Sequence, residues 1–281
     1  MKLIAPAPAK VNISLWVKGK RPDGYHEIIT VMHTVNLYDF LTFMPSDKFE
    51  LTVEGSSSLP LNRSNLIVKA AEVFKEATGI KPKVKVTLKK RIPVGAGLGG
   101  GSSNAAATLK ALNRLYGEPL SGSELQQLAA QIGSDVPFFI RGGLALAYGR
   151  GEKLKTYSPV NFRLLLVYPN FSCPTGEVYG ELPKLSREIT VEEAEKLIIS
   201  PLILGRLDEV EKNAVNDLEK SQHPCVKRVK EEVMPVLKEL GFTPRMSGSG
   251  SSVYAFVRES ENLDLTPLKK RGWWYKLLTA T

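Results

Sequence analysis

The chain has 281 residues, 43% of them hydrophobic and 24% charged, a composition that excludes a disordered or fibrous protein and favours a globular one. No apolar run reaches the ~18 residues of a membrane-spanning helix, so no membrane association is expected. The formal net charge of +9 is compatible with nucleic acid or with a small anionic substrate. Because the basic residues are spread out and no RNA-reading aromatic motif accompanies them, phosphate-rich small molecules explain the charge at least as well.

The N-terminus and the cysteines set the expected compartment. The first residues have too short an apolar part for a secretory signal, and no clear cleavage site follows them. Cys173 and Cys225 are the only cysteines, so a disulfide framework is not expected and a cytoplasmic location is. The three histidines have no ligand spacing with these cysteines, so no fixed protein metal site is predicted.

The first strand and the turn after it carry polar side chains in a regular pattern. Residues 9–17 alternate between apolar and polar, which predicts a half-buried strand with Lys10 and Asn12 on its polar face. An Asp-Gly turn follows, and a second strand is expected over 28–35. The resulting hairpin presents Tyr25 and His26 at its loop.

The remaining periodicities mix strands and helices without regular alternation, which predicts an α+β fold in two domains, residues 1–157 and 158–281. Further strands are expected over 37–44, 49–53, 84–88, 144–148, 162–168, 253–257 and 273–278. Helices are expected over 65–78, 105–116, 123–132, 191–199, 202–210, 226–240 and 263–271. Pro235 should break or kink the helix that contains it. Thr175 is expected to cap a short helix that starts near residue 174.

A glycine-rich stretch joins the strand at 84–88 to the helix at 105–116. Its residues are Pro93, Val94, Gly95, Ala96, Gly97, Leu98, Gly99, Gly100, Gly101, Ser102 and Ser103. Glycines let backbone N–H groups approach an anion, and the unpaired N–H groups of a first helical turn point at it. The two serines can cap the helix or donate hydroxyl groups. The stretch therefore predicts a phosphate-binding loop.

Other interpretations of this loop are weaker. The dinucleotide pattern fits residues 95–100 by letter, but no acidic residue closes a second strand about 20 residues further on. The Walker pattern needs a lysine where Gly101 stands. A plain flexible turn is disfavoured because flexible linkers do not usually run straight into an amphipathic helix.

Three separated pieces of the chain follow the order and approximate spacing of the motifs of one known superfamily. They are residues 10–12, residues 93–104, and a small-residue loop of Ser247, Gly248, Ser249, Gly250, Ser251 and Ser252. On these motifs the chain resembles the GHMP kinases, which include galactokinase, homoserine kinase and mevalonate kinase. The resemblance implies a ribosomal-S5-domain-2-like N-terminal domain and a ferredoxin-like C-terminal domain.

Further strings narrow the resemblance to one branch of the superfamily. Residues 8–13, 21–28, 101–107, 133–139 and 216–218 are similar to those of kinases in the non-mevalonate isoprenoid pathway. This branch implies ATP-dependent phosphorylation, with Mg²⁺, of the 2-hydroxyl of a cytidine-diphosphate methylerythritol. We also expect a monomer or weak homodimer without a nucleic-acid or membrane partner. A GHMP kinase for another alcohol, such as homoserine or mevalonate, and a nucleic-acid-binding module stay open as alternatives.

The resemblance assigns the chemistry to two side chains and the glycine stretch. Asp135 would be the base for the substrate hydroxyl, and Lys10 would lie beside it, favour its ionised form and stabilise the transferring phosphoryl group. The glycine stretch would hold the ATP phosphates, with magnesium bridging them. The plainer alternatives are a helix-start aspartate and a solvated strand lysine.

The resemblance assigns substrate binding to residues outside the glycine stretch. Tyr25 would stack on the cytosine, His26 would read the base edge, and Asn12 would orient the polyol. Thr175 would place a hydroxyl near the substrate, and Ser247, Gly248, Ser249 and Gly250 would close over the site. Each of these residues also has a plainer alternative. Tyr25 could have a packing role alone, and His26 could make a structural hydrogen bond. The loop at residues 247–252, called the late loop below, could be a simple turn.

Overall fold

The computed structural model describes residues 2–55, 59–185, 188–258 and 263–281. The chain forms two compact units that interleave along the sequence. Unit 1 comprises Met1–Ala9, Leu37–Pro93 and Gly99–Gly142, and unit 2 comprises Lys10–Asn36, Val94–Leu98 and Gly143–Thr281. The domain division expected from the sequence cuts the chain once, between residues 157 and 158, and so differs from this grouping.

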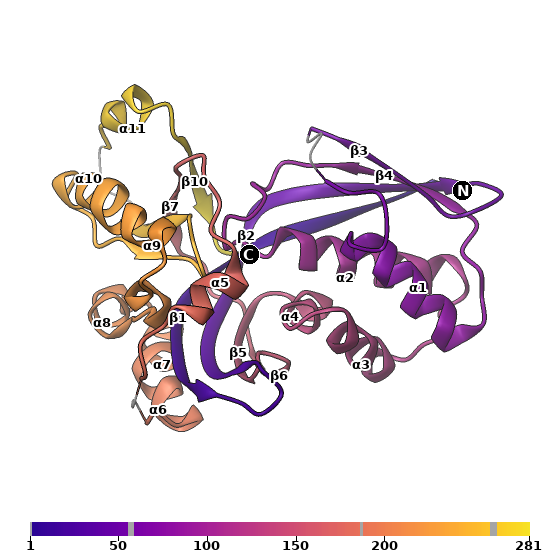
Figure 1. Ribbon diagram of the computed structural model, residues 1–281, viewed down its shortest axis with the longest axis horizontal. Coiled ribbons are helices and arrows are strands. Elements are labelled where there is room, and N and C mark those ends of the chain that lie inside the picture. Colours follow the sequence, from indigo (N-terminus) through magenta and orange to yellow (C-terminus); the bar gives the residue numbers. More distant parts are fainter. Residues whose placement is uncertain (1, 56–58, 186–187, 259–262) are drawn as a thin grey trace. The chain divides into compact units, whose positions relative to one another are not determined.

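Two long paired strands, β1(Leu3–Lys20) and β2(His26–Pro45), each contribute one part to unit 1 and the other part to unit 2 (Figure 1). The sequence predicts two shorter strands where β2 is continuous. The strand continues through Asn36 because no Pro or Gly interrupts it, and the Asn36 side chain accepts a hydrogen bond from the Thr279 N–H at 2.8 Å.

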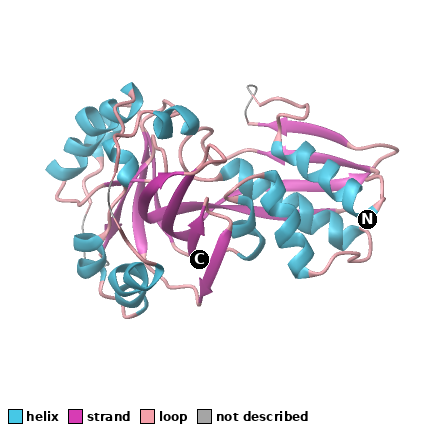
Figure 2. Cartoon of the chain, turned by 60° about the horizontal axis from the view of Figure 1, so that its bottom comes forward, coloured by secondary structure: helices cyan, strands magenta, loops and turns pink. Residues whose placement is uncertain are grey.

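In unit 1, β2 pairs antiparallel with β4(Val84–Lys89), and β4 pairs parallel with β3(Glu50–Glu54). Four helices gather on one face of these strands (Figures 1 and 2). They are α1(Leu66–Thr78), α2(Gly100–Leu115), α3(Gly122–Ile132) and α4(Val136–Arg141). Large apolar side chains from both layers are almost fully buried, namely Phe43, Val86, Phe74, Leu109 and Phe138.

The helix ends of unit 1 follow their capping residues, with one exception. Asn65 caps α1 by accepting from the Ile67 N–H, and Gly79 ends the helix at a φ of 72°. The exception is α2, which begins at Gly100, inside the glycine stretch, rather than at residue 105. Its N-cap is Gly99, and no side chain caps it, so the expected serine cap is wrong. Glycine and serine have low helix propensity, so the sequence does not indicate a helix that begins with these residues.

Unit 2 contains strands of both sheets. Its part of β2 pairs antiparallel with β5(Leu144–Gly149), which pairs with β6(Lys153–Tyr157). The second sheet has the order β10(Trp274–Thr279), β7(Arg163–Tyr168), β9(Val253–Val257), β8(Arg245–Met246) and is antiparallel throughout. Strand β6 has no signal in the sequence, because its residues are largely half-exposed and lack a buried apolar row.

The helices of unit 2 are short and often interrupted. They are α5(Thr175–Gly180), α6(Val191–Ala194), η1(Glu195–Ile199), α7(Ser200–Ile203), α8(Leu207–Asn213), η2(Asp217–Lys220), α9(Pro224–Arg228), η3(Val229–Val233), α10(Met234–Glu239) and α11(Thr266–Lys270). The segment expected to be helical over 226–240 runs without interruption through α9, η3 and α10, so Pro235 does not break it. Instead, the π-helical turn η3 ends at Val233, directly before α10, and Pro235 lies in the first turn of α10. Thr175 is the first residue of α5, not its cap, and Pro174 takes the cap position.

The core of unit 2 joins the segment 224–239 to the second sheet. The buried members that face one another include Val226, Val229, Val233, Leu237, Leu165, Val167, Val253 and Ala255. Their spacing along the segment places one apolar stripe against alternate residues of β7 and β9.

A disulfide lies beside this core. Cys173 and Cys225 are bonded, with their Cα atoms 5.6 Å apart and a separation of 52 positions in the sequence. The bond corrects the sequence expectation, which did not foresee a disulfide. The spacing of the two cysteines in the sequence does not indicate a disulfide, because the residues come together only when the segment before α5 packs on the start of α9.

His33 supplies a pH-dependent contribution to the stability of unit 2. Its Nδ1 lies 2.8 Å from the Thr34 carbonyl, and its Nε2 accepts from the Val160 N–H at 3.1 Å, so Nε2 carries no proton. The ring is fully buried, and this burial lowers the pKa of His33 below its ordinary 6.5, against the opposing effect of the Thr34 carbonyl. The unfolded chain therefore takes up a proton at a higher pH than the folded chain.

We expect the unfolding free energy to be steady above about pH 7 and to fall from about pH 6.5 toward the lower folded-state pKa. Urea unfolding at a series of pH values measures this dependence. His33→Asn should remove part of the slope, whereas His26→Asn, at a less buried ring, should remove less. Equal slopes in the wild type and His33→Asn would contradict the assignment.

Candidate active site

The polar row of β1 is buried in unit 2. Lys10 is 3% exposed and Asn12 is 4% exposed. Lys10 Nζ donates to Asn12 Oδ1, and Asn12 Nδ2 donates to Thr30 Oγ1 at 2.9 Å. A buried ammonium needs polar partners, so this burial argues against the alternative of a solvated strand lysine.

Parts of all three sequence motifs share hydrogen bonds around this row. The Lys10 N–H donates to the Leu98 carbonyl at 3.0 Å, which ties β1 to the glycine stretch. The Asn12 N–H donates to Ser247 Oγ at 3.3 Å, and Ser247 Oγ donates to the Gly97 carbonyl at 3.0 Å. Residues 94–98, residues 247–252 and β1 therefore form one polar cluster within unit 2.

Two glycines of this cluster have a positive φ and close neighbours, and Gly97 has no room for a side chain. Gly97 has a φ of 74°, and a Cβ there would lie 2.0 Å from the Ser247 carbonyl oxygen. Gly248 has a φ of 55°, and its Cβ would lie 3.1 Å from Asn12 Oδ1 and 3.3 Å from Lys10 Nζ. The glycines thus permit the close approach of two backbone segments to each other and to Lys10.

The Asn216 side chain also holds the late loop by hydrogen bonds to its backbone. Its Nδ2 donates to the Met246 carbonyl at 2.7 Å and to the Gly248 carbonyl at 2.8 Å. Its Oδ1 accepts from the Leu218 N–H at 3.0 Å. The loop serines Ser247, Ser249, Ser251 and Ser252 are all buried, which does not fit a simple surface turn.

The remaining glycine-stretch residues form the first turn of α2 in unit 1. The first N–H groups of a helix have no intrahelical partner, so the turn from Gly100 to Ser102 offers donors to an anion. Ser103 Oγ is buried without a hydrogen-bond partner among the described residues, and so is Ser252 Oγ in unit 2. Unpartnered buried hydroxyls are rare in folded proteins.

A buried charged cluster holds the strand that leads into the glycine stretch, and the sequence analysis missed it. The fully buried Asp39 on β2 accepts from Lys90 Nζ at 2.7 Å and from Asn104 Nδ2 at 3.0 Å. It also accepts from the N–H groups of Arg91 and Ile92 at 2.6 and 2.8 Å. The sequence offered one indication of this cluster, which is that Asp39 is a single carboxylate within an otherwise apolar strand pattern.

The cluster is matched in charge and packed against the start of α2. Burial lowers the pKa of the Lys90 ammonium, and Asp39 opposes this effect. Lys90 Nζ also donates to the Ile92 carbonyl at 2.5 Å. A Cβ at Gly100 would lie 3.0 Å from Lys90 Nζ, so the ion pair and the first turn of α2 are in direct contact.

Asp135 occupies the position before α4 in unit 1 and is half-buried. Its side chain makes no cap bond to the helix, and the Val136 N–H bonds the Gly133 carbonyl instead. Asp135 therefore stands at the helix start, as the plainer alternative has it, but its side chain does not cap the helix.

The loop between β1 and β2 presents aromatic side chains. Tyr25 is 50% exposed, and the Arg150 guanidinium lies 5.1 Å from its ring centre. The rings of His26 and Tyr179 are 5.1 Å apart. Burial lowers the pKa of His26, with a smaller effect in the same direction from Lys20. Tyr179 and Arg150 were not foreseen, because they come from distant segments without a motif.

Thr175 and the late loop are in contact. Thr175 Oγ1 lies 2.9 Å from Ser249 Oγ, so its hydroxyl takes part in the polar cluster rather than in a helix cap. The expected substrate residue therefore lies beside the loop that is expected to close over the site.

Comparisons with known proteins agree with this arrangement. Residues 65–143 match the family model of the GHMP kinase N-terminal domain. The 4-diphosphocytidyl-2-C-methyl-D-erythritol kinase of Persephonella marina is 40% identical over 95% of both chains. The kinase of that name from Bacillus cereus is 40% identical over 94% of this chain and 91% of its own. This chain belongs to the 4-diphosphocytidyl-2-C-methyl-D-erythritol kinase family.

Solved structures support the same assignment. A 4-(cytidine 5'-diphospho)-2C-methyl-D-erythritol kinase structure is 34% identical, covers the whole of both chains and has a TM-score of 0.78. The homoserine kinase of Cytophaga hutchinsonii covers all of this chain and 94% of its own at 20% identity and a TM-score of 0.70, and shares the fold alone. The chain therefore has the GHMP kinase fold with mixed α+β content, as the sequence predicts.

In this family member, the Asp39 cluster should contribute strongly to the stability of unit 1. Asp39→Ala leaves the Lys90 ammonium buried without its carboxylate, and we expect it to lower the unfolding free energy by about 3–5 kcal/mol. Denaturant unfolding measures the change. Glu72→Ala is the control, because it removes an exposed ion pair with Arg63 in the same unit and should change little. Equal effects of the two substitutions would contradict the prediction.

Proposed function

We propose that the chain transfers the γ-phosphoryl group of ATP to the 2-hydroxyl of 4-diphosphocytidyl-2-C-methyl-D-erythritol, as a phosphotransferase with an alcohol acceptor in isoprenoid precursor synthesis. The names of relatives that match nearly the whole chain support this activity. The observation that carries it is the polar cluster of unit 2, in which Lys10, Gly97 and Ser247 meet.

The glycine stretch would hold the nucleotide. Phosphoryl transfer requires mainly positioning and charge stabilisation, which backbone N–H groups supply without reorganisation. The uncapped first turn of α2 and the unpartnered hydroxyl of Ser103 support phosphate binding in unit 1. The left-handed glycines support it for residues 95–98 of unit 2.

Lys10 and Asp135 would act on the reacting groups. Asp135 would accept or orient the proton of the acceptor hydroxyl, and Lys10 would stabilise the charge on the transferring phosphoryl group. The burial of Lys10 among polar groups supports its role, because such a site keeps an ammonium in a fixed position. Asn12, bonded to Lys10, would contact the substrate polyol.

Tyr25 and His26 would bind the cytosine. The half-exposed ring of Tyr25 can stack on a base, and Tyr179 adds a second aromatic surface beside His26. The lowered pKa of His26 favours the neutral imidazole, which has one donor and one acceptor for a base edge. Thr175 and the loop from Ser247 to Gly250 would close over the bound substrate.

Magnesium would be carried by the nucleotide phosphates. Within the described ranges of the chain, no group of three or more His, Cys, Asp or Glu side chains could hold an ion alone. The glycine stretch fits a nucleotide whose charge is partly neutralised, since its own donors are backbone N–H groups and serine hydroxyls. Magnesium supplies charge neutralisation at the phosphates when it is bound.

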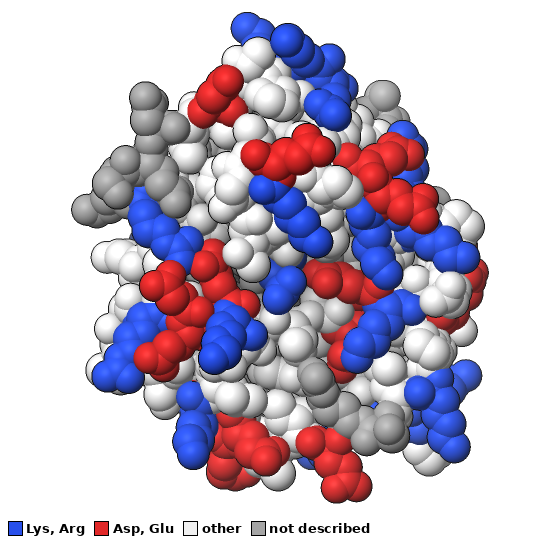
Figure 3. All heavy atoms as spheres, turned by 90° about the vertical axis from the view of Figure 1, so that its left-hand side faces the viewer, with Lys and Arg blue, Asp and Glu red and all other residues white. Residues whose placement is uncertain are grey.

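The alternatives have weaker support. The likeness to homoserine and mevalonate kinases lies at 20% identity or less in the structures compared, which supports only the fold. On the face in Figure 3, Lys and Arg side chains are interspersed with Asp and Glu, so that face has no continuous basic stripe for nucleic acid. No described helix is long and apolar enough to cross a membrane.

The finer expectations belong to the same proposal. They are a cytoplasmic monomer or weak homodimer, an S5-like domain over residues 1–157, and a ferredoxin-like domain over residues 158–281. Product formation from the cytidyl substrate, homoserine and mevalonate, each with magnesium-ATP, tests the activity. We expect phosphate transfer to the cytidyl substrate alone. Absence of that product would overturn the proposal.

Substitution of the proposed base should separate binding from chemistry. We expect Asp135→Asn to lower kcat by about 10²-fold or more, because general base catalysis of this kind contributes 10²–10⁴-fold. Nucleotide affinity, measured by calorimetry, should stay unchanged. Asp47→Asn at the surface is the control. A kcat within a few-fold of the wild type would exclude Asp135 as the base.

Removal of the proposed stacking ring should act on one substrate only. We expect Tyr25→Ala to raise the KM for the cytidyl substrate about tenfold, since base–aromatic stacking is worth about 1–3 kcal/mol. The KM for ATP should not change. Tyr25→Phe keeps the ring and should restore the affinity. A cytidyl KM that is equal in all three proteins would show that Tyr25 does not contact the base.

A further inference from the structure

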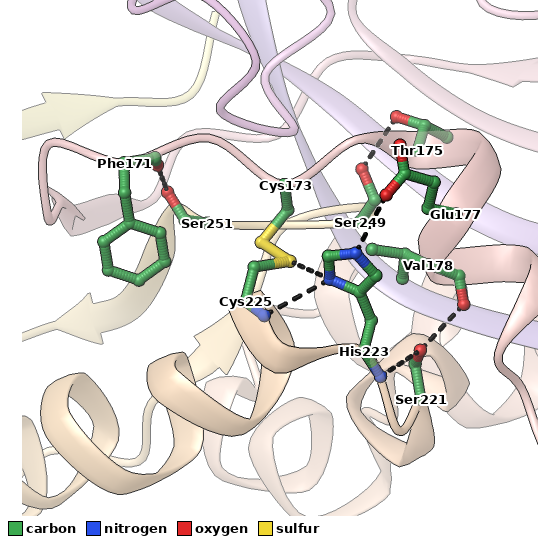
Figure 4. The surroundings of a disulfide bond; sticks show 10 residues. All are labelled: Phe171, Cys173, Thr175, Glu177, Val178, Ser221, His223, Cys225, Ser249 and Ser251. Carbon is green, nitrogen blue, oxygen red and sulfur yellow. Dashed lines mark hydrogen bonds and ion pairs between the residues drawn. A yellow bond between two sulfur atoms is a disulfide. The ribbon is translucent and has the colours of Figure 1, made fainter.

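We propose that Cys173 and Cys225 are a redox-active pair, in which a hydroperoxide oxidises Cys225 with His223 as the base and a dithiol reduces the disulfide again. The pair joins the segment before α5 to the start of α9 (Figure 4). Cys173 is 2% exposed, whereas Cys225 is partly exposed. An exogenous reagent therefore reaches Cys225 first.

His223 has the tautomer that this role needs. Its Nδ1 lies 3.0 Å from Cys225 Sγ and accepts from the Cys225 N–H at 3.2 Å (Figure 4). A backbone N–H can only donate, so Nδ1 carries no proton and is able to receive one from the Cys225 thiol. The proton on Nε2 is directed at Glu177 Oε2, 3.1 Å away, which orients the ring.

Oxidation follows from this geometry. The Cys225 thiol gives its proton to His223 Nδ1, and the thiolate attacks a peroxide oxygen, so that an S–O bond forms and the O–O bond breaks. The departing alkoxide takes the proton from His223. The Cys173 thiol then attacks the Cys225 sulfur and expels water, which yields the disulfide. Two thiols and one hydroperoxide thus become a disulfide, an alcohol and water.

Reduction reverses the state of the pair. A thiolate of a dithiol attacks the Cys225 sulfur and releases Cys173, and the second thiol of the reagent then closes on the mixed disulfide. The second thiol of the reagent gives its proton to His223 Nδ1 as it attacks, and Cys225 leaves as a thiolate that takes this proton from His223. The Cys173 thiolate takes a proton from the solvent, which replaces the one that the first reagent thiol lost. The dithiol becomes a cyclic disulfide, and two protein thiols are restored.

The bond fixes a segment that contacts both loops of the polar cluster in unit 2. The Cys173 N–H donates to the Gly95 carbonyl at 3.2 Å. Ser251 Oγ donates to the Phe171 carbonyl, and Thr175 Oγ1 lies 2.9 Å from Ser249 Oγ (Figure 4). Reduction therefore removes the covalent link between α9 and the segment that carries Thr175. This consequence for turnover rests on the proposed function, whereas the thiol chemistry does not.

The thiol chemistry is tested on the full-length protein without a kinase assay. Maleimide labelling in denaturant should find two thiols after native reduction with dithiothreitol and none after one equivalent of hydrogen peroxide. His223→Asn keeps a helix-capping side chain but removes the base, and should slow reoxidation about tenfold or more and alter its pH profile. Glu181→Gln, in the same segment as Glu177, should leave the rate unchanged.

Two results would overturn the redox-active pair. One is a disulfide that survives excess dithiothreitol in the folded protein, which would make it a permanent cross-link. The other is an equal reoxidation rate and pH profile in His223→Asn and the wild type, which would remove His223 from the chemistry.

The effect on the kinase is measured separately. We expect reduction to lower kcat/KM for the cytidyl substrate by roughly three- to tenfold, because small displacements of substrate-positioning groups are costly, and peroxide should restore it. Cys173→Ser and Cys225→Ser should both stay at the lower value under either reagent. Equal kcat/KM in the two redox states would overturn the control of turnover. A protein without activity in both states would refute the proposed function, while the labelling results still decide the redox pair.

Discussion

The contact between Gly97 and the Ser247 carbonyl governs the polar cluster of unit 2. A Cβ at residue 97 would lie 2.0 Å from that oxygen, so the two loops can approach only if the residue is glycine. This approach brings the Ser247 hydroxyl within reach of both the Gly97 carbonyl and the Asn12 N–H. The position of Asn12, and through it that of the Lys10 ammonium, depends on this backbone contact.

The glycine stretch meets a different constraint in unit 1. There the first turn of α2 lies against Lys90 and Ile92, and Cβ atoms at Gly100 would come within 3.0 and 3.1 Å of them. Asp39 holds Lys90 and the N–H groups of Arg91 and Ile92 in place, so a buried carboxylate determines where the helix begins. The stretch is rich in glycine because successive parts of it pack closely against different neighbours.

The sequence predicted those features that local patterns determine. Alternation over residues 9–17 identified the strand that carries Lys10, and Asn65 and Gly79 marked the ends of α1. Features that depend on tertiary packing were not predictable in this way. The start of α2 at Gly100 contradicts helix propensity, because the packing around Lys90 outweighs the cost of glycine. The bond between Cys173 and Cys225 depends on two segments that no local pattern connects.

Two buried side-chain hydroxyls, those of Ser103 and Ser252, make no hydrogen bond within the described part of the chain. Each is buried without a partner among the described residues, and each such group costs about 1–3 kcal/mol in a folded protein. Their neighbours in both units are densely hydrogen-bonded, so poor packing does not explain the two exceptions. Ser103 lies within the residues that match the GHMP kinase N-terminal family model, and Ser252 lies in the small-residue loop at 247–252. Buried polar groups without a partner are rare in folded proteins, so these two hydroxyls are exceptions within otherwise hydrogen-bonded loops.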